Sequence, residues 1–132
     1  MTTLGGGVDS PSHTVLVVDD DAAIRFLCRV NLELDGWTVL EAATVGAARA
    51  AVSQGDVDVV LLDVHLGAES GFDFLAELRA EHPGLPVAML TGSVGTPSLV
   101  GVEVDAVISK PFRPEELTAT VLSLMPLAPN AG

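Results

Sequence analysis

Five short runs of apolar, largely β-branched residues alternate with segments of helical pattern, and this alternation constrains the fold more than any other feature. The runs lie at 14–18, 37–41, 57–62, 86–90 and 106–109. Their nearly continuous hydrophobicity is typical of parallel strands that are covered on both faces. Strands that alternate with helices predict an α/β protein with an open, doubly wound sheet.

The segments between these runs carry the spacing of amphipathic helices. Apolar residues recur every three or four positions from Ile24 to Leu34, and Gly36 then provides a stop signal. Similar patterns predict helices near 44–53 and 72–78, and a last helix that begins at Pro114. The Gly-rich stretch 92–104 leaves room for only a turn or two of helix.

Length and composition predict a single folded domain. The chain has 132 residues, of which 48% are hydrophobic and 18% charged, as in compact globular proteins. Residues 1–12 are mostly Gly, Ser, Thr and Pro and predict a flexible N-terminal tail. The folded domain is expected over 13–125, followed by a short C-terminal tail over 126–132.

The charge balance excludes several classes of partner. A net charge of −12 argues against a nucleic-acid surface, which needs clustered Lys and Arg. No window approaches the roughly 18 consecutive apolar residues of a membrane span, and the N-terminus lacks a signal-peptide pattern. The expected location is therefore cytoplasmic.

The single cysteine, Cys28, cannot form an internal disulfide and is expected to pack as a small hydrophobe.

Polar residues stand at the carboxyl ends of four predicted strands. Three consecutive aspartates, 19–21, follow the first strand, and Asp63 follows the third. Thr91 follows the fourth strand and Lys110, the only lysine in the chain, follows the fifth. Ligands of open α/β sheets bind at this edge, above all where the strand order reverses. Each residue alone reads equally well as an ordinary loop residue, but together they predict one shared site.

These residue types suit phosphoryl chemistry with a divalent cation. Clustered carboxylates repel unless a cation is present, and Mg²⁺ prefers such hard oxygen ligands. Asp63 ends a buried run and could attack a phosphoryl donor to form an acyl phosphate. Lys110 would supply a positive charge and Thr91 a hydroxyl donor. Two structural explanations stay open at this point: the aspartates after the first strand cap a helix, and Asp63 forms an ion pair with Lys110.

Four sequence strings resemble the motifs of response-regulator receiver domains, in the same order. They are VLVVDDD (15–21), LLDVHLGAESG (61–71), LTG (90–92) and SKPF (109–112). The resemblance extends from about His13 to Met125. It implies a flavodoxin-like (βα)5 fold with a parallel sheet of strand order 2-1-3-4-5. It also implies a role in two-component phosphorelay signalling as a phosphoprotein.

The resemblance also implies a metal site. Asp20 and Asp63 would ligate Mg²⁺ together with the backbone carbonyl of His65, and Asp19 would hold a metal-bound water. Mn²⁺ would be an acceptable substitute. Gly71 lies eight residues after Asp63, which is the family spacing.

The remaining motif residues imply the phosphorylation chemistry. Asp63 would be the phosphoacceptor, with Thr91 and Lys110 as the family's hydroxyl and lysine, and the Lys110-Pro111 bond would be cis. The donor would be a sensor histidine kinase or a histidine phosphotransfer protein. The chain would then signal by contact with an unknown downstream protein, as a stand-alone monomer or weak dimer. Beyond assisting its own phosphorylation and dephosphorylation, it is not expected to be an enzyme.

Three features depart from the family pattern. Gly67 replaces a common proline, which should loosen the loop after Asp63. Val107 occupies a position that usually holds an aromatic ring, and the segment between Thr91 and Lys110 is short. We therefore expect intact phosphorylation but an output that differs from the common pattern.

Other functions fit the sequence less well. An aspartyl phosphatase would need a second acid two residues after its nucleophile, where this chain has His65. A flavin or nucleotide site at TGSVGT (91–96) would follow the fourth strand rather than the first, with no accompanying motif. The main rival is a receiver-like interaction module that works without phosphorylation.

Overall fold

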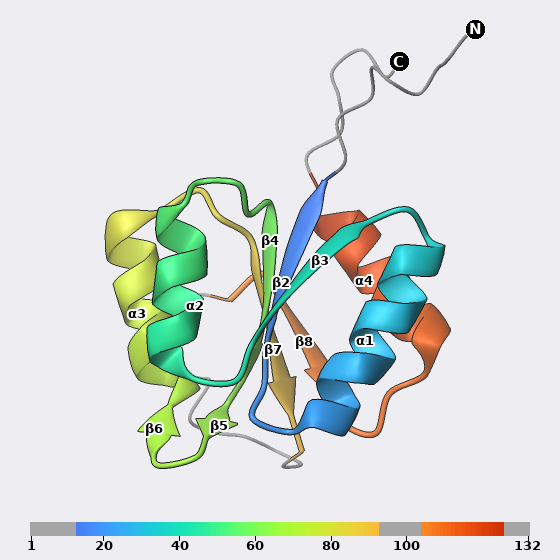
Figure 1. Cartoon of the computed structure of the whole chain (residues 1–132), viewed down its shortest axis with the longest axis horizontal. Helices are drawn as coiled ribbons and strands as arrows, with labels where there is room; N and C mark the ends of the chain where they lie inside the picture. Colours follow the sequence, from blue (N-terminus) through green and yellow to red (C-terminus); the bar gives the residue numbers. More distant parts are fainter. Residues whose placement is uncertain (1–12, 93–103, 126–132) are drawn as a thin grey trace, which may run out of the picture.

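The computed structural model describes residues 13–92 and 104–125, and in these residues five strands form one parallel sheet (Figure 1). The strands are β2 (Thr14–Val18), β3 (Thr38–Ala42), β4 (Val59–Asp63), β7 (Val87–Thr91) and β8 (Ala106–Ser109). Their spatial order is β3-β2-β4-β7-β8, which is 2-1-3-4-5 when only these strands are numbered. The predicted fold class and strand order are confirmed.

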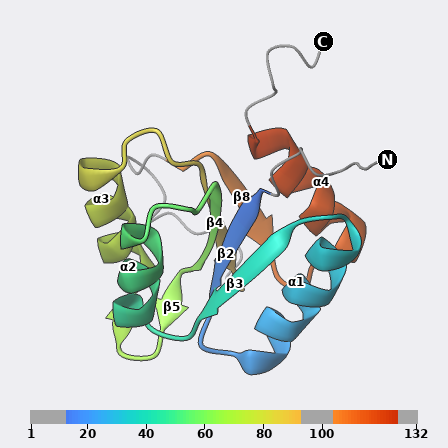
Figure 2. The same ribbon diagram turned by 45° about the horizontal axis from the view of Figure 1, so that its top comes forward.

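Helices cover both faces of the sheet. They are α1 (Ala22–Leu34), α2 (Val45–Ser53), α3 (Gly71–Glu81) and α4 (Pro114–Leu124). Helices α1 and α4 lie on one face, and α2 and α3 lie on the other (Figures 1 and 2). The turn or two of helix expected within the stretch 92–104 falls on residues 93–103, which lie outside the described residues. None of the described helices is long and apolar enough to cross a membrane.

The inner strands β2, β4 and β7 are almost entirely apolar because each face of the sheet has its own hydrophobic core. On β2, Leu16 and Val18 belong to the cluster under α2 and α3. The alternate residues, Val15 and Val17, belong to the cluster under α1 and α4. Cys28 on α1 is fully buried in this second cluster, as expected. Side chains that alternate between two buried faces leave no polar face in the sequence pattern.

Side-chain caps set the starts of three helices. The Asp21 carboxylate accepts the Ala23 N–H at 2.9 Å and begins α1, so one aspartate of the acidic run is a helix cap. The Thr44 hydroxyl accepts from Ala47 at the start of α2. The Ser70 hydroxyl accepts from Phe72 at the start of α3. These caps place the loops that follow β2, β3 and β4 at one edge of the sheet.

Three strands lie one or two residues later than predicted. Asp63 and Thr91 are the last residues of β4 and β7 rather than the first loop residues. Before β4, the Asp58 carboxylate accepts the Thr14 N–H at 2.7 Å, which makes residue 58 part of the connection into the strand. A short hairpin of β5 (His65–Leu66) and β6 (Glu69–Ser70), which was not predicted, follows β4.

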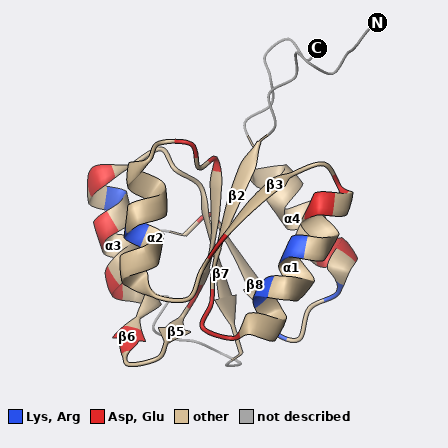
Figure 3. Ribbon diagram, viewed as in Figure 1, with Lys and Arg blue, Asp and Glu red and all other residues tan. Residues whose placement is uncertain are grey.

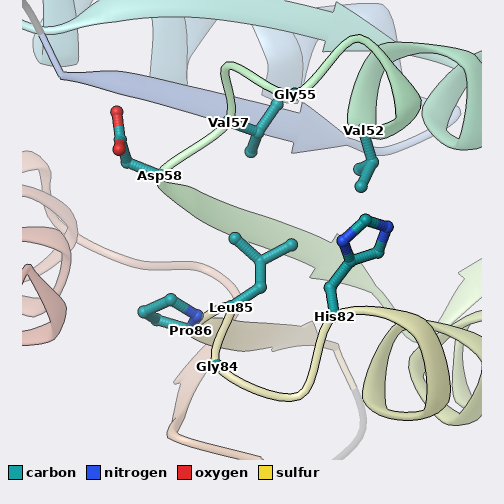
Figure 4. A pocket seen from close by; sticks show the side chains of 8 residues that line it. All are labelled: Val52, Gly55, Val57, Asp58, His82, Gly84, Leu85 and Pro86. Carbon is teal, nitrogen blue, oxygen red and sulfur yellow. The ribbon is translucent and has the colours of Figure 1, made fainter.

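A pocket of about 350 Å³ lies at the amino-terminal edge of the sheet (Figure 4). Its lining comes from the connections before β4 and β7 and includes Val57, Asp58, His82, Leu85 and Pro86. None of the predicted site residues lines it, because they stand at the opposite, carboxyl-terminal edge.

Candidate functional site

The predicted site residues meet at the carboxyl ends of β2, β4, β7 and β8. Strands β2 and β4 are neighbours whose connections run in opposite directions, which is the reversal point where open α/β sheets bind ligands. The turn between β2 and α1 is acidic (Figure 3). Among the described residues, the buried polar side chains are Asp19, Asp63 and Thr91. All three lie at this edge, so the sheet concentrates its buried polarity in one place.

Lys110 connects the two buried carboxylates. Its Nζ donates to Oδ2 of Asp19 at 2.7 Å and to Oδ1 of Asp63 at 3.3 Å. The lysine directly follows β8, and its main-chain N–H donates to the carbonyl of Thr91 at 2.8 Å. The Lys110-Pro111 bond is cis, as expected. The ion pair between Asp63 and Lys110 is therefore present, within a three-residue cluster that also contains Asp19.

Asp19 is fully buried, and both of its carboxylate oxygens and both of its main-chain polar groups have hydrogen-bond partners. Its Oδ1 accepts the N–H of Asp21 at 2.9 Å, while Oδ2 accepts from Lys110. Its main-chain carbonyl accepts from Nη1 of Arg25 at 2.7 Å, and its N–H donates to Ala42. A buried charge needs such partners, because removal from water is costly. These contacts hold Asp19 in one orientation.

The electrostatics of the cluster oppose ionisation of Asp63. Burial raises the pKa of Asp63, and the nearby Asp19 charge raises it further. The Lys110 charge and hydrogen bond, together with a hydrogen bond from the His65 backbone, lower the pKa but do not cancel the increase. For Lys110, burial lowers the pKa, but the hydrogen bond and charge of Asp19, supported by Asp63, outweigh it and raise the value.

Three carboxylates are arranged so that they could hold a cation. Asp19, Asp20 and Asp63 each offer one oxygen, and these atoms lie within 4.8 Å of one another. Three carboxylates beside one ammonium leave an excess of negative charge, and an all-oxygen donor set suits Mg²⁺ or Mn²⁺. The residues therefore fit the implied metal. Metal ligation by the backbone carbonyl of His65 stays a prediction.

Gly71 is required by a close approach between backbones. A Cβ at this position would collide with the main-chain carbonyl oxygen of Asp63, and it would also crowd Val64. The Gly71 N–H donates to the Val64 carbonyl at 2.7 Å. The start of α3 thus packs directly against the end of β4. This contact explains why a glycine eight residues after Asp63 matters to the site.

Two contributors to the site are missing from the sequence prediction. The first is Arg25, which binds the Asp19 carbonyl and also donates from Nε to Oε1 of Glu41 at 3.0 Å. Arg25 lies in the first turn of α1, close in sequence to the acidic run, and this position could have indicated a contact with the aspartates. The second is the main-chain N–H of Gly67, which donates to Oδ2 of Asp20 at 3.0 Å. Gly67 belongs to the turn of the β5–β6 hairpin, and the looser loop expected from it stays a prediction.

A second departure from the family pattern, Val107, lies in β8, the outermost strand on one side of the sheet. Val107 in β8 is 43% exposed, whereas the neighbouring Ile108 is buried. The position that usually holds a ring therefore presents a small side chain to solvent. Most of the short segment between Thr91 and Lys110 lies outside the described residues.

Comparison with known proteins identifies the family. Residues 15–122 match the model described as "Response regulator receiver domain". The probable transcriptional regulatory protein TcrX of Mycobacterium tuberculosis is 37% identical over 120 residues, which are 89% of this chain and 51% of that protein. The phosphate regulon transcriptional regulatory protein PhoB of Pseudomonas aeruginosa is 35% identical over 117 residues, or 85% and 51%. The chain spans about half the length of these relatives.

Solved structures agree with this assignment. The chemotaxis protein CheY4 of Vibrio cholerae has a TM-score of 0.81 at 28% identity, over 87% of this chain and 100% of that chain. A CheY-like receiver domain protein of Methanospirillum hungatei has a TM-score of 0.80 at 28% identity, over 86% and 93%. On its sequence match, its fold and its gathered motif residues, the chain belongs to the response regulator receiver domain family.

Proposed function

We propose that this chain accepts a phosphoryl group on Asp63 in a reaction that depends on Mg²⁺. The observation that carries the proposal is the position of Lys110 Nζ, which contacts both Asp19 and Asp63 at the reversal point of the sheet. A purely structural pair would need one carboxylate, whereas this cluster has an additional buried acid and a third acid close by. The donor is a sensor histidine kinase or a histidine phosphotransfer protein.

In this proposal Asp63 is the nucleophile. One carboxylate oxygen attacks phosphorus, a bond forms between them, and the bond from phosphorus to the donor's imidazole nitrogen breaks. Lys110 turns from an ion pair with Asp63 to a contact with a phosphoryl oxygen, and the Thr91 hydroxyl donates to another. Asp19 keeps the ammonium in place during this exchange.

Asp20 and Asp63 would hold the metal directly, with the backbone carbonyl of His65 as a further ligand, and Asp19 would hold it through a bound water. Bound Mg²⁺ would offset negative charge on the phosphoryl oxygens and on the acids themselves. Since burial and the Asp19 charge raise the pKa of Asp63, positive charge at this site favours the ionised, nucleophilic form.

Phosphorylation with a small donor tests the proposal. The chain is incubated with acetyl phosphate and Mg²⁺, and its intact mass is measured. We expect the gain of one phosphoryl group, which is lost when EDTA removes the metal and in Asp63→Asn. Unchanged mass at saturating donor and Mg²⁺ would instead support the rival function, an interaction module that works without phosphorylation.

We propose that the output is a protein contact made in the cytoplasm. The curated relatives are named as DNA-binding or transcriptional regulators, and this chain matches only about half of each. The net charge of −12 on this chain disfavours its direct binding to nucleic acid. The partner is therefore a downstream protein that distinguishes the phosphorylated from the unphosphorylated form. The chain itself acts as a monomer or weak dimer.

A further inference from the structure

The loop after Asp63 contacts the acidic cluster through a main-chain group. The N–H of Gly67 donates to Oδ2 of Asp20 at 3.0 Å. Asp20 differs from its neighbours in the cluster, because its side chain is exposed while Asp19 and Asp63 are buried. An exposed carboxylate that lacked this donor would be free to sample several rotamers.

The contact depends on the conformation of residue 67. Gly67 has a φ of +63°, in the left-handed region, and connects the paired strands of the β5–β6 hairpin. Glycine adopts this conformation without strain. Proline could not, because its ring fixes φ near −65° and it has no N–H to donate. The departure from the common proline therefore adds a donor that a proline-containing loop would lack at this position.

We propose that Gly67 is a positioning residue that holds Asp20 toward Asp19 and Asp63 before a divalent cation arrives. The ordering of the exposed carboxylate is then achieved during folding instead of during metal binding, and affinity for the cation rises accordingly. This inference rests on the metal site of the proposed function. It goes beyond it by assigning a role to a main-chain amide of this chain.

Two substitutions separate the conformation and the donor from the side chain. A Cβ at Gly67 would meet nothing within 4 Å, so the space beside it is open. Asparagine tolerates positive φ and keeps the N–H, and Gly67→Asn is therefore the matched control. Gly67→Pro removes the donor and cannot keep the turn. Circular dichroism establishes that both variants are folded.

The test is the affinity for Mg²⁺, measured by calorimetry without any phosphodonor. We expect Gly67→Pro to bind Mg²⁺ about three- to tenfold more weakly than the parent, as the loss of one hydrogen bond to a partly solvated carboxylate implies. Gly67→Asn should stay within about twofold, since Asn populates the left-handed region. Equal affinity of Gly67→Pro and the parent would overturn the inference.

A double-mutant cycle shows whether Gly67 acts through Asp20. In an Asp20→Ala background, Gly67→Pro should cause no further loss of Mg²⁺ affinity. The same loss in both backgrounds would mean that the hairpin acts on the site by another route, and would also overturn the inference.

A measurement on the metal-free chain needs no change at residue 67. We expect hydrogen exchange at the Gly67 amide to be slower in the parent than in Asp20→Ala, because the carboxylate protects the N–H. Equal exchange rates would contradict the contact itself. If the parent does not bind Mg²⁺, the proposed metal dependence is refuted. The exchange comparison would still report whether the contact between Gly67 and Asp20 exists.

Discussion

Lys110 donates a 2.7 Å hydrogen bond to Oδ2 of Asp19, a side chain that has no solvent exposure. The lysine is thus the counterion of a carboxylate that water does not reach, as well as a neighbour of Asp63. This contact joins the end of β8 to the end of β2, two strands that are not adjacent in the sheet. The same residue therefore serves both stability and the proposed chemistry.

Replacing Lys110 should destabilise the metal-free chain. Lys110→Met leaves the buried Asp19 without its counterion, and removal of one partner from a buried pair costs about 3 to 5 kcal/mol in free energy of unfolding. Urea unfolding monitored by circular dichroism measures this change. Adding Asp19→Asn to the same chain should restore much of the loss. A Lys110→Met variant as stable as the parent would show that Asp19 does not depend on the lysine.

Ionisation of Asp63 should lower the free energy of unfolding of the metal-free chain as the pH rises. Because burial and the Asp19 charge raise the pKa of Asp63, ionisation is less favourable in the folded state than in the unfolded state. The parent therefore loses stability relative to Asp63→Asn between the ordinary aspartate value, about 3.9, and the raised pKa of the folded state. Above that range the difference stays constant.

Denaturant unfolding of both chains across this pH range tests the prediction. Saturating Mg²⁺ should reduce the difference in stability between the parent and Asp63→Asn, because the cation stabilises the ionised carboxylate of the parent. Asp56→Asn, at an exposed position, is the matched control. A difference between parent and Asp63→Asn that stays flat with pH, or that shrinks as the pH rises, would contradict the assigned electrostatics.

Gly71→Ala should disturb both the fold and the acceptor. The new Cβ collides with the carbonyl of Asp63, and overpacking of this kind costs about 1 to 3 kcal/mol. Phosphorylation by acetyl phosphate should slow as well, since β4 must shift where Asp63 stands. Gly84→Ala is the control, because a Cβ there meets nothing within 4 Å. Thermal unfolding that gives equal midpoints for the two variants would disprove the close approach.

Much of the fold was predictable because it follows from side-chain patterns. Residues such as Val15 and Leu16 face opposite cores, so β2 reads as an uninterrupted apolar run. The site was predictable for a related reason: parallel strands end at one edge, which brings Asp63 and Lys110 together from distant parts of the sequence.

The missing details depend on tertiary contacts that no local pattern encodes. Three adjacent aspartates have three different roles: Asp21 caps α1, Asp19 is buried against Lys110, and Asp20 is exposed and meets Gly67. A run of identical residues does not reveal which member turns inward. The short β5–β6 hairpin has only two residues in each strand, which is too few to leave a recognisable strand pattern in the sequence.

Localisation of the phosphoryl group tests the central claim most directly. The chain is phosphorylated with acetyl phosphate and Mg²⁺, the acyl phosphate is reduced with borohydride, and the modified residue is located by tandem mass spectrometry of peptides. We predict a single modified residue, Asp63, where reduction converts the side chain to an alcohol. Modification at Asp19, Asp20 or His65 with Asp63 left intact would contradict the account.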